Sequence, residues 1–386
     1  MKIQSIRFLI FLAVFMIGLS TARPQSGGFL PIPNQVVAWG QDWDGETNTP
    51  TTVSNVLQIA PGFKHALAIL SDGTVTGWGQ NINGALDFPN GLSNVVQVAA
   101  GEGFSLALLS NGTMTIWGGY AIPSALVVTN LPNVSDVVAI AAGELYAIAL
   151  RSDGTVIEWG AVWTNAAYHN AVAPPGLSNV VSISAGDYHT AARLADGTIR
   201  MWGDNTYGEC DIPIPTSEIK TISCGAEYTV VLRTNGTVIA WGYSYGGLIA
   251  VPAGLSNVVE ICAGGNQTLA RTADGRVVAW GYDYFGSCDV PVPLYPAITI
   301  KSSGNAFSMA VVRPTTLSMK IVSGKPTLTI TAISGIYEVE RATALSEPFV
   351  AVGQVEVVNN APATFQDLPI QMQTANFYRA RYLGPQ

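Results

Sequence analysis

The chain has 386 residues, of which 48% are hydrophobic and only 11% are charged, and its formal net charge is −8. This length suits one large β domain with a smaller one, and the 40 glycines favour short strands and tight turns over long solvated helices. No basic stripe is present to neutralise phosphates, so the composition argues against a nucleic-acid partner.

The first 22 residues have the pattern of a secretory signal peptide. Lys2 and Arg7 give a positive start, an apolar run from Phe8 to Leu19 follows, and Ser20-Thr21-Ala22 offers small residues for cleavage. The apolar run is too short to span a bilayer comfortably, and no later stretch is long enough. We therefore expect a mature protein that is secreted, periplasmic or held at the cell envelope, with no transmembrane segment.

After an expected linker over residues 23–33, one sequence motif recurs along the chain. The dipeptide Trp-Gly occurs seven times, at steps of 39, 39, 42, 43, 39 and 39 residues. A second marker, a bend at a glycine that follows Pro, Ala, Cys or Ser, also occurs seven times, from Gly62 to Gly304. A period near 40 residues predicts a repeat architecture. The fixed repeat position predicts a role in packing the repeats together for Trp39, Trp78, Trp117, Trp159, Trp202, Trp241 and Trp280.

Each repeat is divided into short strands. In the second full repeat, residues 95–100 (VVQVAA) and 105–109 form two expected strands, Asn111-Gly112 forms a tight turn, and residues 113–117 form a third strand. A loop with Gly and Pro then leads to a short fourth strand or extended segment. Strands that are apolar on both faces are expected when each sheet lies between neighbouring sheets. Four-stranded sheets arranged radially make a β-propeller.

The two ends of the repeat region complement each other. Val36 to Gly40 provides a Trp-Gly strand with no strand pair before it, whereas residues 298–300 and 307–312 provide two strands with no Trp-Gly strand after them. The N-terminal strand is therefore expected to complete the last blade. The sequence predicts an all-β fold with a seven-bladed β-propeller over residues 34–313. An open β-solenoid, which would need capping units, is the alternative.

The repeat pattern V-V-x-[IV]-[AS]-A-G-x-x-[HYF]-[ST]-x-A-L-x-x-[DN]-G-T-V-x-x-W-G resembles the regulator of chromosome condensation repeat over residues 34–313. Its compact spacing, as in VPAGLSNVVEICAGG from Val251, is similar to a bacterial subgroup that includes the secreted propeller-type β-lactamase inhibitor protein. The resemblance implies a propeller fold, with inhibition of a β-lactamase or related enzyme as a special case. The nucleotide-exchange role of the eukaryotic relative is not expected for an exported chain. Function on a shared fold depends on grafted sites.

A different pattern begins after the repeats. Residues 314–386 alternate apolar and polar residues in about six short runs, such as PTLTITAI and FVAVGQVEVV. We expect a small C-terminal β-sandwich-like domain here. A spacer or attachment role is the simplest interpretation of it.

The sequence offers little for catalysis, and we predict no catalytic residue, no cofactor and no metal site. The four cysteines have no Cys-x-x-Cys spacing, only three histidines are present, and neither a Gly-x-Ser-x-Gly elbow nor a phosphate loop occurs. His65 and His189 occupy a repeat position shared with Phe and Tyr, which indicates a structural role. Acids that follow the marker glycine, such as Glu144 and Asp187, leave open a cation site or an enzyme (hydrolase or lyase) at an acidic mouth.

The loops that follow Trp-Gly carry many aromatic residues. Because strand direction alternates, these loops and the marker-glycine bends are expected at the same end of the propeller. Exposed aromatic rings are typical binding anchors, and they also stack on sugars or pack against neighbouring loops. We predict a monomeric, non-enzymatic binding protein for an extracytoplasmic protein, with a polysaccharide-binding or cell-surface scaffold module as the alternative. The candidate partner-binding residues are Trp43, Tyr120, Trp163, Tyr168, Tyr207, Tyr243, Tyr245, Tyr282, Tyr284 and Phe285.

Overall fold

The computed structural model describes residues 34–119, 128–164, 167–283, 285–291, 294 and 297–312, together with the backbone of six strands between residues 316 and 384. One compact unit comprises Asn34–Val312, and the C-terminal strands belong to a second unit. The described residues are all-β apart from three short 3-10 turns. Across this part of the chain, no helix has the length and apolar character needed to cross a membrane.

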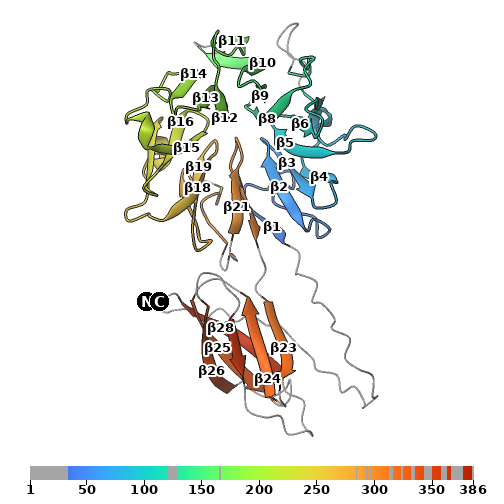
Figure 1. Ribbon diagram of the computed structural model, residues 1–386, viewed down its shortest axis with the longest axis vertical. Helices are drawn as coiled ribbons and strands as arrows, with labels where there is room; N and C mark the ends of the chain where they lie inside the picture. The colour runs from blue at the N-terminus through green and yellow to red at the C-terminus, as the bar shows by residue number, and fades with distance from the viewer. Residues whose placement is uncertain are drawn as a thin grey trace. The chain divides into compact units, whose positions relative to one another are not determined.

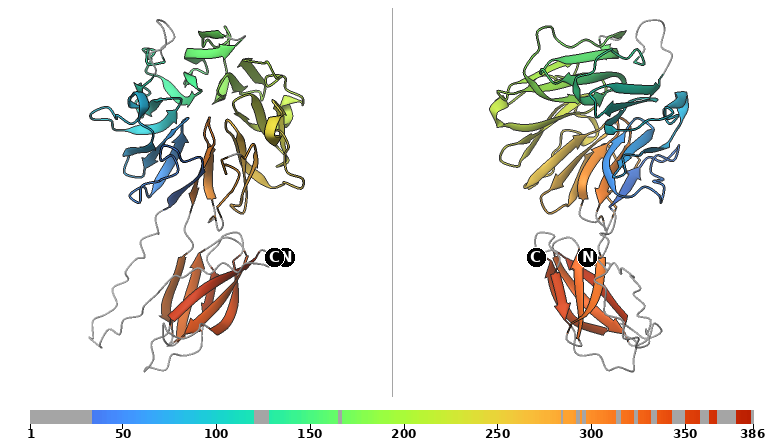
Figure 2. Two further views of the ribbon diagram at one scale, coloured as in Figure 1. Left: turned by 180° about the vertical axis from the view of Figure 1, so that it is seen from behind. Right: turned by 45° about the vertical axis from the view of Figure 1, so that its right-hand side comes forward.

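The unit Asn34–Val312 consists of seven antiparallel sheets in a ring (Figure 1 and Figure 2). The innermost strands of successive sheets contact each other in chain order, and the last contacts the first. The ring is therefore closed, which confirms the predicted seven-bladed β-propeller. The innermost strands of blades 1 to 7 are β2 (Val56–Pro61), β5 (Val95–Ala100), β8 (Val137–Ala142), β12 (Val180–Ala185), β15 (Ile219–Cys224), β18 (Val258–Ala263) and β21 (Ala297–Ser302).

Each blade continues outward with a middle strand and a strand that ends in Trp-Gly. The middle strands are β3 (His65–Leu70), β6 (Phe104–Leu109), β9 (Leu145–Arg151), β13 (His189–Leu194), β16 (Tyr228–Arg233), β19 (Gln267–Thr272) and β22 (Phe307–Val312). The third strands are β4 (Val75–Gly79), β7 (Met114–Gly118), β10 (Val156–Thr164), β14 (Ile199–Gly203), β17 (Val238–Gly242), β20 (Val277–Gly281) and β1 (Gln35–Gly40).

Blade 7 is built from both ends of the propeller sequence. Strand β1 pairs antiparallel with β22, so that Gln35 lies opposite Val312 and Gly40 lies opposite Phe307. Strand β21 pairs with the other edge of β22. The N-terminal strand thus completes the last blade, as the sequence predicted.

The blades differ in the segment after Trp-Gly, for which the sequence left open a short fourth strand or an extended segment. Only blade 3 has a fourth strand in the described residues, β11 (Ala167–Asn170), which forms a hairpin with β10. In blade 1 the chain turns after Gly79 and uses side chains to bond its backbone locally: the Leu86 N–H donates to Asn81 Oδ1 at 2.8 Å. Such locally bonded N–H groups are not available to a fourth strand. The 3-10 turns η1 (Ile82–Gly84), η2 (Thr216–Glu218) and η3 (Tyr245–Gly247) lie in these connecting segments.

The tryptophans of the Trp-Gly pairs join neighbouring blades. The indole Nε1 of Trp78 donates to the Glu46 carbonyl at 2.9 Å, and that of Trp241 donates to the Glu209 carbonyl at 2.9 Å. In each case the acceptor lies in the loop that follows the Trp-Gly pair of the preceding blade. The same bond is made by Trp39 to Ser287, Trp117 to Ala85, Trp159 to Val128 and Trp280 to Leu248. Trp202 differs, because it donates to the Glu158 carboxylate at 2.8 Å.

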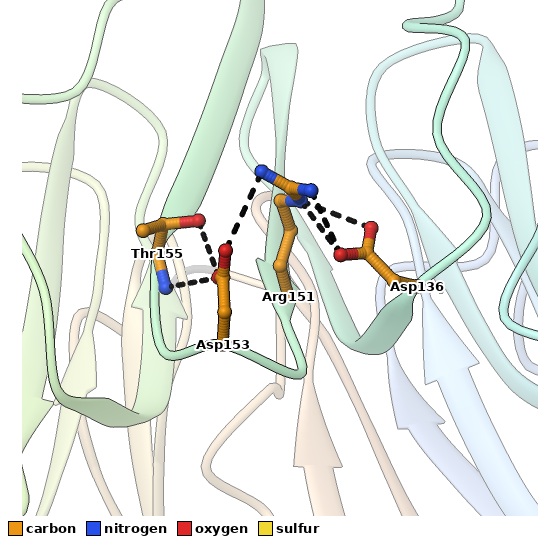
Figure 3. A network of polar contacts seen from close by, with 4 residues as sticks. All are labelled: Asp136, Arg151, Asp153 and Thr155. Atoms are coloured by element: carbon orange, nitrogen blue, oxygen red, sulfur yellow. Dashed lines mark hydrogen bonds and ion pairs between the residues drawn. The ribbon is translucent and has the colours of Figure 1, made fainter.

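The opposite end of the propeller carries the Asp-Gly and Asn-Gly turns, whose side chains are bonded within the turn (Figure 3). Asp153 Oδ1 accepts hydrogen bonds from the Thr155 N–H at 2.9 Å and the Thr155 hydroxyl at 2.6 Å. Arg151 forms a salt bridge with Asp136 at 2.8 Å and approaches Asp153 at 3.6 Å. Arg151 therefore offsets part of the negative charge of the two acids at this turn.

The C-terminal unit contains two antiparallel sheets. One is formed by β23 (Thr316–Val322), β24 (Lys325–Thr331) and β27 (Ala363–Gln366), and the other by β25 (Gly335–Ala342), β26 (Val350–Val357) and β28 (Phe377–Gly384). Strands β26 and β27 are in contact, so the two sheets meet. This arrangement agrees with the predicted six-stranded, sandwich-like domain.

Candidate binding face

The marker-glycine bends and the loops after Trp-Gly lie at one end of the propeller. The Gln80 N–H donates to the Lys64 carbonyl at 2.8 Å, and the Tyr243 N–H donates to the Glu227 carbonyl at 2.8 Å, so each loop is bonded to the bend of its own blade. We call this end the loop face. Its described residues are 41–48, 61–64, 80–87, 101–103, 143–144, 160–164, 167–170, 186–188, 204–211, 225–227, 243–250, 264–266, 282–283, 285–289 and 303–306.

Four tyrosines form a continuous strip across the loops of blades 4, 5 and 6. The ring of Tyr207 lies 4.5 Å from that of Tyr243, and the rings of Tyr243 and Tyr245 are stacked at 6.1 Å with an interplanar angle of 19°. Tyr245 in turn lies 5.3 Å from Tyr282. Tyr207 is 45% exposed and Tyr245 is 58% exposed, whereas the other two rings are half-buried. We call these four residues the tyrosine strip.

The backbone of blade 5 places the strip. Tyr245 begins η3, and Gly246 follows it with a φ of 64°. A Cβ atom at position 246 would lie only 2.5 Å from the Cβ of Tyr282, so a glycine is needed for the two loops to approach. Tyr243 also packs against the buried cluster around Leu248 and Trp280. The half-buried rings therefore support the exposed ones.

The other aromatic candidates form two separate pairs. Trp43, which is 68% exposed, meets Phe285 edge-on at 4.9 Å. Trp163 and Tyr168 meet edge-on, with ring centroids 4.8 Å apart, across the β10–β11 hairpin. The structure thus brings the predicted aromatics together as one strip and two pairs. Tyr120 and Tyr284 lie outside the described residues.

The marker bends line a small cavity of about 80 Å³ at the propeller axis, and Glu102, Glu144 and Asp187 form the acidic part of its lining. Burial, followed by the Glu102 carboxylate, raises the pKa of Glu144 to about 7. Burial and then the carboxylates of Glu144 and Glu102 hold the pKa of Asp187 well above its usual range. Because burial and like charges both disfavour the ionised form, this centre holds protons more tightly than free carboxyl groups do.

Backbone hydrogen bonds fix the acidic bends around the axis. The Glu102 N–H donates to the Glu144 carbonyl at 2.8 Å, and the Asp187 N–H donates to the Gly225 carbonyl at 3.2 Å. A Cβ atom at Gly143 would lie 2.0 Å from the ring of Tyr146, which explains why this bend requires glycine. The acids are therefore held by a ring of blade-to-blade bonds that the sequence alone did not reveal.

The described residues contain no group of three or more His, Cys, Asp or Glu side chains placed to hold a metal ion. His65 and His189 are buried between blades, where their Nε2 atoms lie 3.0 Å from Ser105 Oγ and 2.9 Å from Thr229 Oγ1. Burial lowers the pKa of each imidazole to about 4, so both are neutral near pH 7. All four cysteines are free.

Sequence reasoning missed two features near this face. The β10–β11 hairpin accounts for the step of 43 residues after Trp159, which was the available signal for an insertion in blade 3. Glu158, which precedes Trp159, was not singled out, although it accepts hydrogen bonds from Trp202 and Thr190. Other repeats have uncharged residues at this position, so a charged residue there was the signal.

The closed ring and its repeated indole bonds define a β-propeller built from repeats of about 40 residues. The model of the Regulator of chromosome condensation (RCC1) repeat matches residues 56–85, 95–119, 180–209, 219–247 and 258–287, so the propeller contains RCC1 repeats. No curated protein matches the chain significantly.

Solved structures share this fold at low sequence identity. Prp20p from Saccharomyces cerevisiae is 18% identical, with a TM-score of 0.63, over 73% of this chain and 92% of that one. Human WBSCR16 is 16% identical, with a TM-score of 0.57, over 72% of this chain and 99% of that one. The ectodomain of the receptor kinase CR4 from Physcomitrella patens is 20% identical, with a TM-score of 0.54, over 70% and 80%.

Proposed function

We propose that this chain is a secreted, non-enzymatic binding protein that uses the tyrosine strip to hold another extracytoplasmic protein. The observation that carries the proposal is the unbroken series of ring contacts from Tyr207 to Tyr282, with Tyr207 and Tyr245 exposed to solvent. Export is proposed from the signal-like pattern of residues 1–22, and a monomeric state is proposed with it.

The strip has the physical properties of a protein-binding anchor. Tyrosine supplies a large apolar contact and a polar hydroxyl at a low cost in side-chain entropy, and it is enriched among residues that dominate binding energy. The stacking of Tyr243 and Tyr245 restricts both rings before a partner arrives. Less conformational freedom then has to be lost on binding.

A protein partner is favoured by what similar propellers bind. The structural study of Prp20p describes its binding properties to Gsp1p and histones, which are proteins. Inhibition of a β-lactamase or related enzyme is the special case suggested by the sequence resemblance. Recognition of a polysaccharide by the same rings is the rival proposal, since sugar rings also stack on flat apolar faces.

The test immobilises the mature chain and two double variants, and identifies which secreted and envelope proteins of its source each one retains. In one, Tyr207→Ala and Tyr245→Ala remove the exposed rings of the strip. In the control, Val96→Ala and Val138→Ala remove side chains that are 56% and 54% exposed near the opposite end. We expect a protein retained by the wild type to be lost only from the tyrosine variant.

Retention of the same proteins by the folded tyrosine variant would overturn the proposal. Retention of glycan without protein, lost in the same variant, would move the assignment to polysaccharide binding. A purified β-lactamase panel, assayed for loss of turnover in the presence of the wild-type chain, tests the special case.

A further inference from the structure

The loop face is strongly acidic. Among its described residues the cationic side chain is Lys64, which is 3.8 Å from Asp44, and Lys301 lies nearby as the penultimate residue of β21. Thirteen acidic side chains share this face: Asp42, Asp44, Glu46, Asp87, Glu102, Glu144, Asp187, Asp204, Glu209, Asp211, Glu227, Asp283 and Asp289. Several are only partly buried, so the face carries a large negative potential over its surface.

The remaining cations of the described propeller lie at or next to the Asp-Gly turns, at the opposite end: Arg151, Arg193, Arg200, Lys220, Arg233, Arg271 and Arg276. There Arg151, Arg233 and Arg271 form ion pairs with acids. Arg151 pairs with Asp136, as Figure 3 shows, and Arg233 pairs with Glu218. The molecule therefore separates its charges along the propeller axis, and the unbalanced acids are on the loop face.

The tyrosine strip lies among these acids. The Tyr207 N–H donates to the Glu209 carboxylate at 2.8 Å, and the Tyr243 N–H donates to the Glu227 carbonyl at 2.8 Å. The Glu227 carboxylate is the main cause of a raised pKa of the Tyr207 hydroxyl, and Asp204 adds to it. Exposed ring faces and partly exposed carboxylates thus occur side by side.

Lysine and arginine side chains match both parts of this surface. A guanidinium or ammonium group is attracted to the face of an aromatic ring and also to a carboxylate. Arginine in particular stacks on a ring while it donates hydrogen bonds in its own plane. An acidic or purely apolar partner would instead meet uncompensated negative charge, which suppresses binding.

Resting on the function proposed above, we propose that the partner protein presents a cluster of arginine and lysine side chains to the loop face. Its cations lie over the exposed rings of Tyr207 and Tyr245 and pair with the carboxylates of Glu227 and Asp204. The remaining acids of the face attract the partner during its approach. This attraction weakens as the salt concentration rises.

The test uses two double variants that remove the same charge from opposite ends. Asp204→Asn with Glu227→Gln neutralises two acids beside the strip. Asp72→Asn with Asp196→Asn neutralises two turn acids, whose Oδ1 atoms accept the N–H of Thr74 and Thr198. The repeat itself uses Asn111 and Asn235 in this role, with the same bond to Thr113 and Thr237, so the control substitutions keep the turn intact.

The probe is a fluorescent peptide of alternating arginine and glycine, and a glutamate–glycine peptide of equal length is its control. Affinity is measured by anisotropy with the mature chain at low and at physiological salt. We expect the arginine peptide to bind the wild-type chain. Its affinity is expected to fall about tenfold for the loop-face variant and to change by less than about twofold for the turn-end variant. Tyr245→Ala is expected to weaken binding, and Tyr245→Phe to retain it.

Equal weakening in both charge variants would overturn the inference, because it would show attraction to net charge alone. Binding that is unaffected by Tyr245→Ala would also overturn it. These outcomes are distinct from failure of the proposed function. The proposed function would still hold if a protein partner needed Tyr207 and Tyr245 but bound equally well to the variant at Asp204 and Glu227. That result would rule out only the basic character of the partner.

Discussion

At the scale of single residues, the contact between blades 3 and 4 shows how the repeated indole bond adapts. The loop that would present a carbonyl to Trp202 is replaced in blade 3 by the β10–β11 hairpin. Glu158 accepts the indole N–H instead, at 2.8 Å, and also accepts the Thr190 hydroxyl at 2.8 Å. Burial raises the pKa of Glu158, whereas these two hydrogen bonds oppose the rise. The Glu158 carboxylate thus accepts the indole hydrogen bond that a backbone carbonyl accepts at the other blade interfaces.

The acidic centre predicts a pH dependence of stability. Burial and Glu102 raise the pKa of Glu144 to about 7, above its ordinary value. Between the unfolded and folded pKa values, the folded chain binds more protons than the unfolded chain, so the free energy of unfolding falls as pH rises. From pH 5 to pH 8 we expect Glu144 to account for a loss of about 1–2 kcal/mol, after allowance for solvent screening. Urea unfolding of the wild type and of Glu144→Gln at both pH values measures this loss.

The control for this prediction is Asp153→Asn. Hydrogen bonds from Thr155 lower the pKa of Asp153 below its ordinary value, so this group does not titrate between pH 5 and pH 8. The variant is expected to keep the wild-type pH dependence. A Glu144→Gln protein that loses as much stability as the wild type over this range would contradict the assignment of the raised pKa.

At the scale of elements, several loops after Trp-Gly share one hydrogen bond. The side chain of the second residue after Trp-Gly accepts the backbone N–H five residues later, and we call this contact the clamp. In blade 4, Asn205 accepts the Cys210 N–H at 2.8 Å and donates to Asp211 at 3.1 Å. In blade 6, Asp283 accepts the Cys288 N–H at 2.8 Å in the same way. The equivalent of Asp211 there is Asp289, so two carboxylates stand where blade 4 has an amide and a carboxylate. Burial is the main cause of the raised pKa of the Cys288 thiol, and the negative charges of Asp283 and Asp289 add to it.

This comparison predicts opposite effects for two reciprocal substitutions. Asp283→Asn gives blade 6 the amide donor that blade 4 already has, and it removes one of the two negative charges at these positions of the loop. We expect the free energy of unfolding to rise by about 0.5–1.5 kcal/mol, the usual net value of one hydrogen bond. Asn205→Asp is expected to lower it by a similar amount. Chemical denaturation at pH 7 measures both, and a shift of the two variants in the same direction would refute the clamp.

The sequence predicts the blades because the glycine of Trp-Gly meets the same close contact, with the marker bend of its own blade, in one repeat after another. A Cβ atom at Gly79, for example, would lie 2.6 Å from the Lys64 carbonyl oxygen, and its φ is 94°, so Trp must be followed by Gly. The number of strands per blade was not predictable in this way. It depends on whether the backbone after Trp-Gly bonds to a neighbouring strand or to a local side chain such as Asn81.

The candidate site was predictable in composition but not in arrangement. Alternating strand direction placed the aromatic loops at one end, and the bonds between loops and bends agree with that reasoning. Which rings meet depends on the close approach of Gly246 to Tyr282, a contact between blades. Spacing in the sequence does not report such a distance. The separation of charge along the axis also required the strand directions to be known.

At the scale of the whole molecule, closure of the ring depends on a strand that is far from its partners in sequence. In β1, Val36 packs with Phe307 and Met309 on one side of blade 7, and Trp39 packs with Ile300 on the other. The Trp39 indole also donates to the Ser287 carbonyl at 2.9 Å. Without β1, strand β22 would become an open edge with exposed apolar side chains. The ring is therefore expected to be more stable than the sum of its blades.

A split version of the propeller tests this closure. A chain that begins at Gln41 lacks β1, and we expect its free energy of unfolding to fall by more than about 3 kcal/mol, since it loses buried Val36 and Trp39. A synthetic peptide of residues 34–40 is expected to restore the melting temperature in a concentration-dependent way, because it binds the folded chain and not the unfolded one. A peptide of the same composition in scrambled order is the control. If the shortened chain melted like the full chain, or if both peptides restored it equally, β1 would not be the strand that closes the ring.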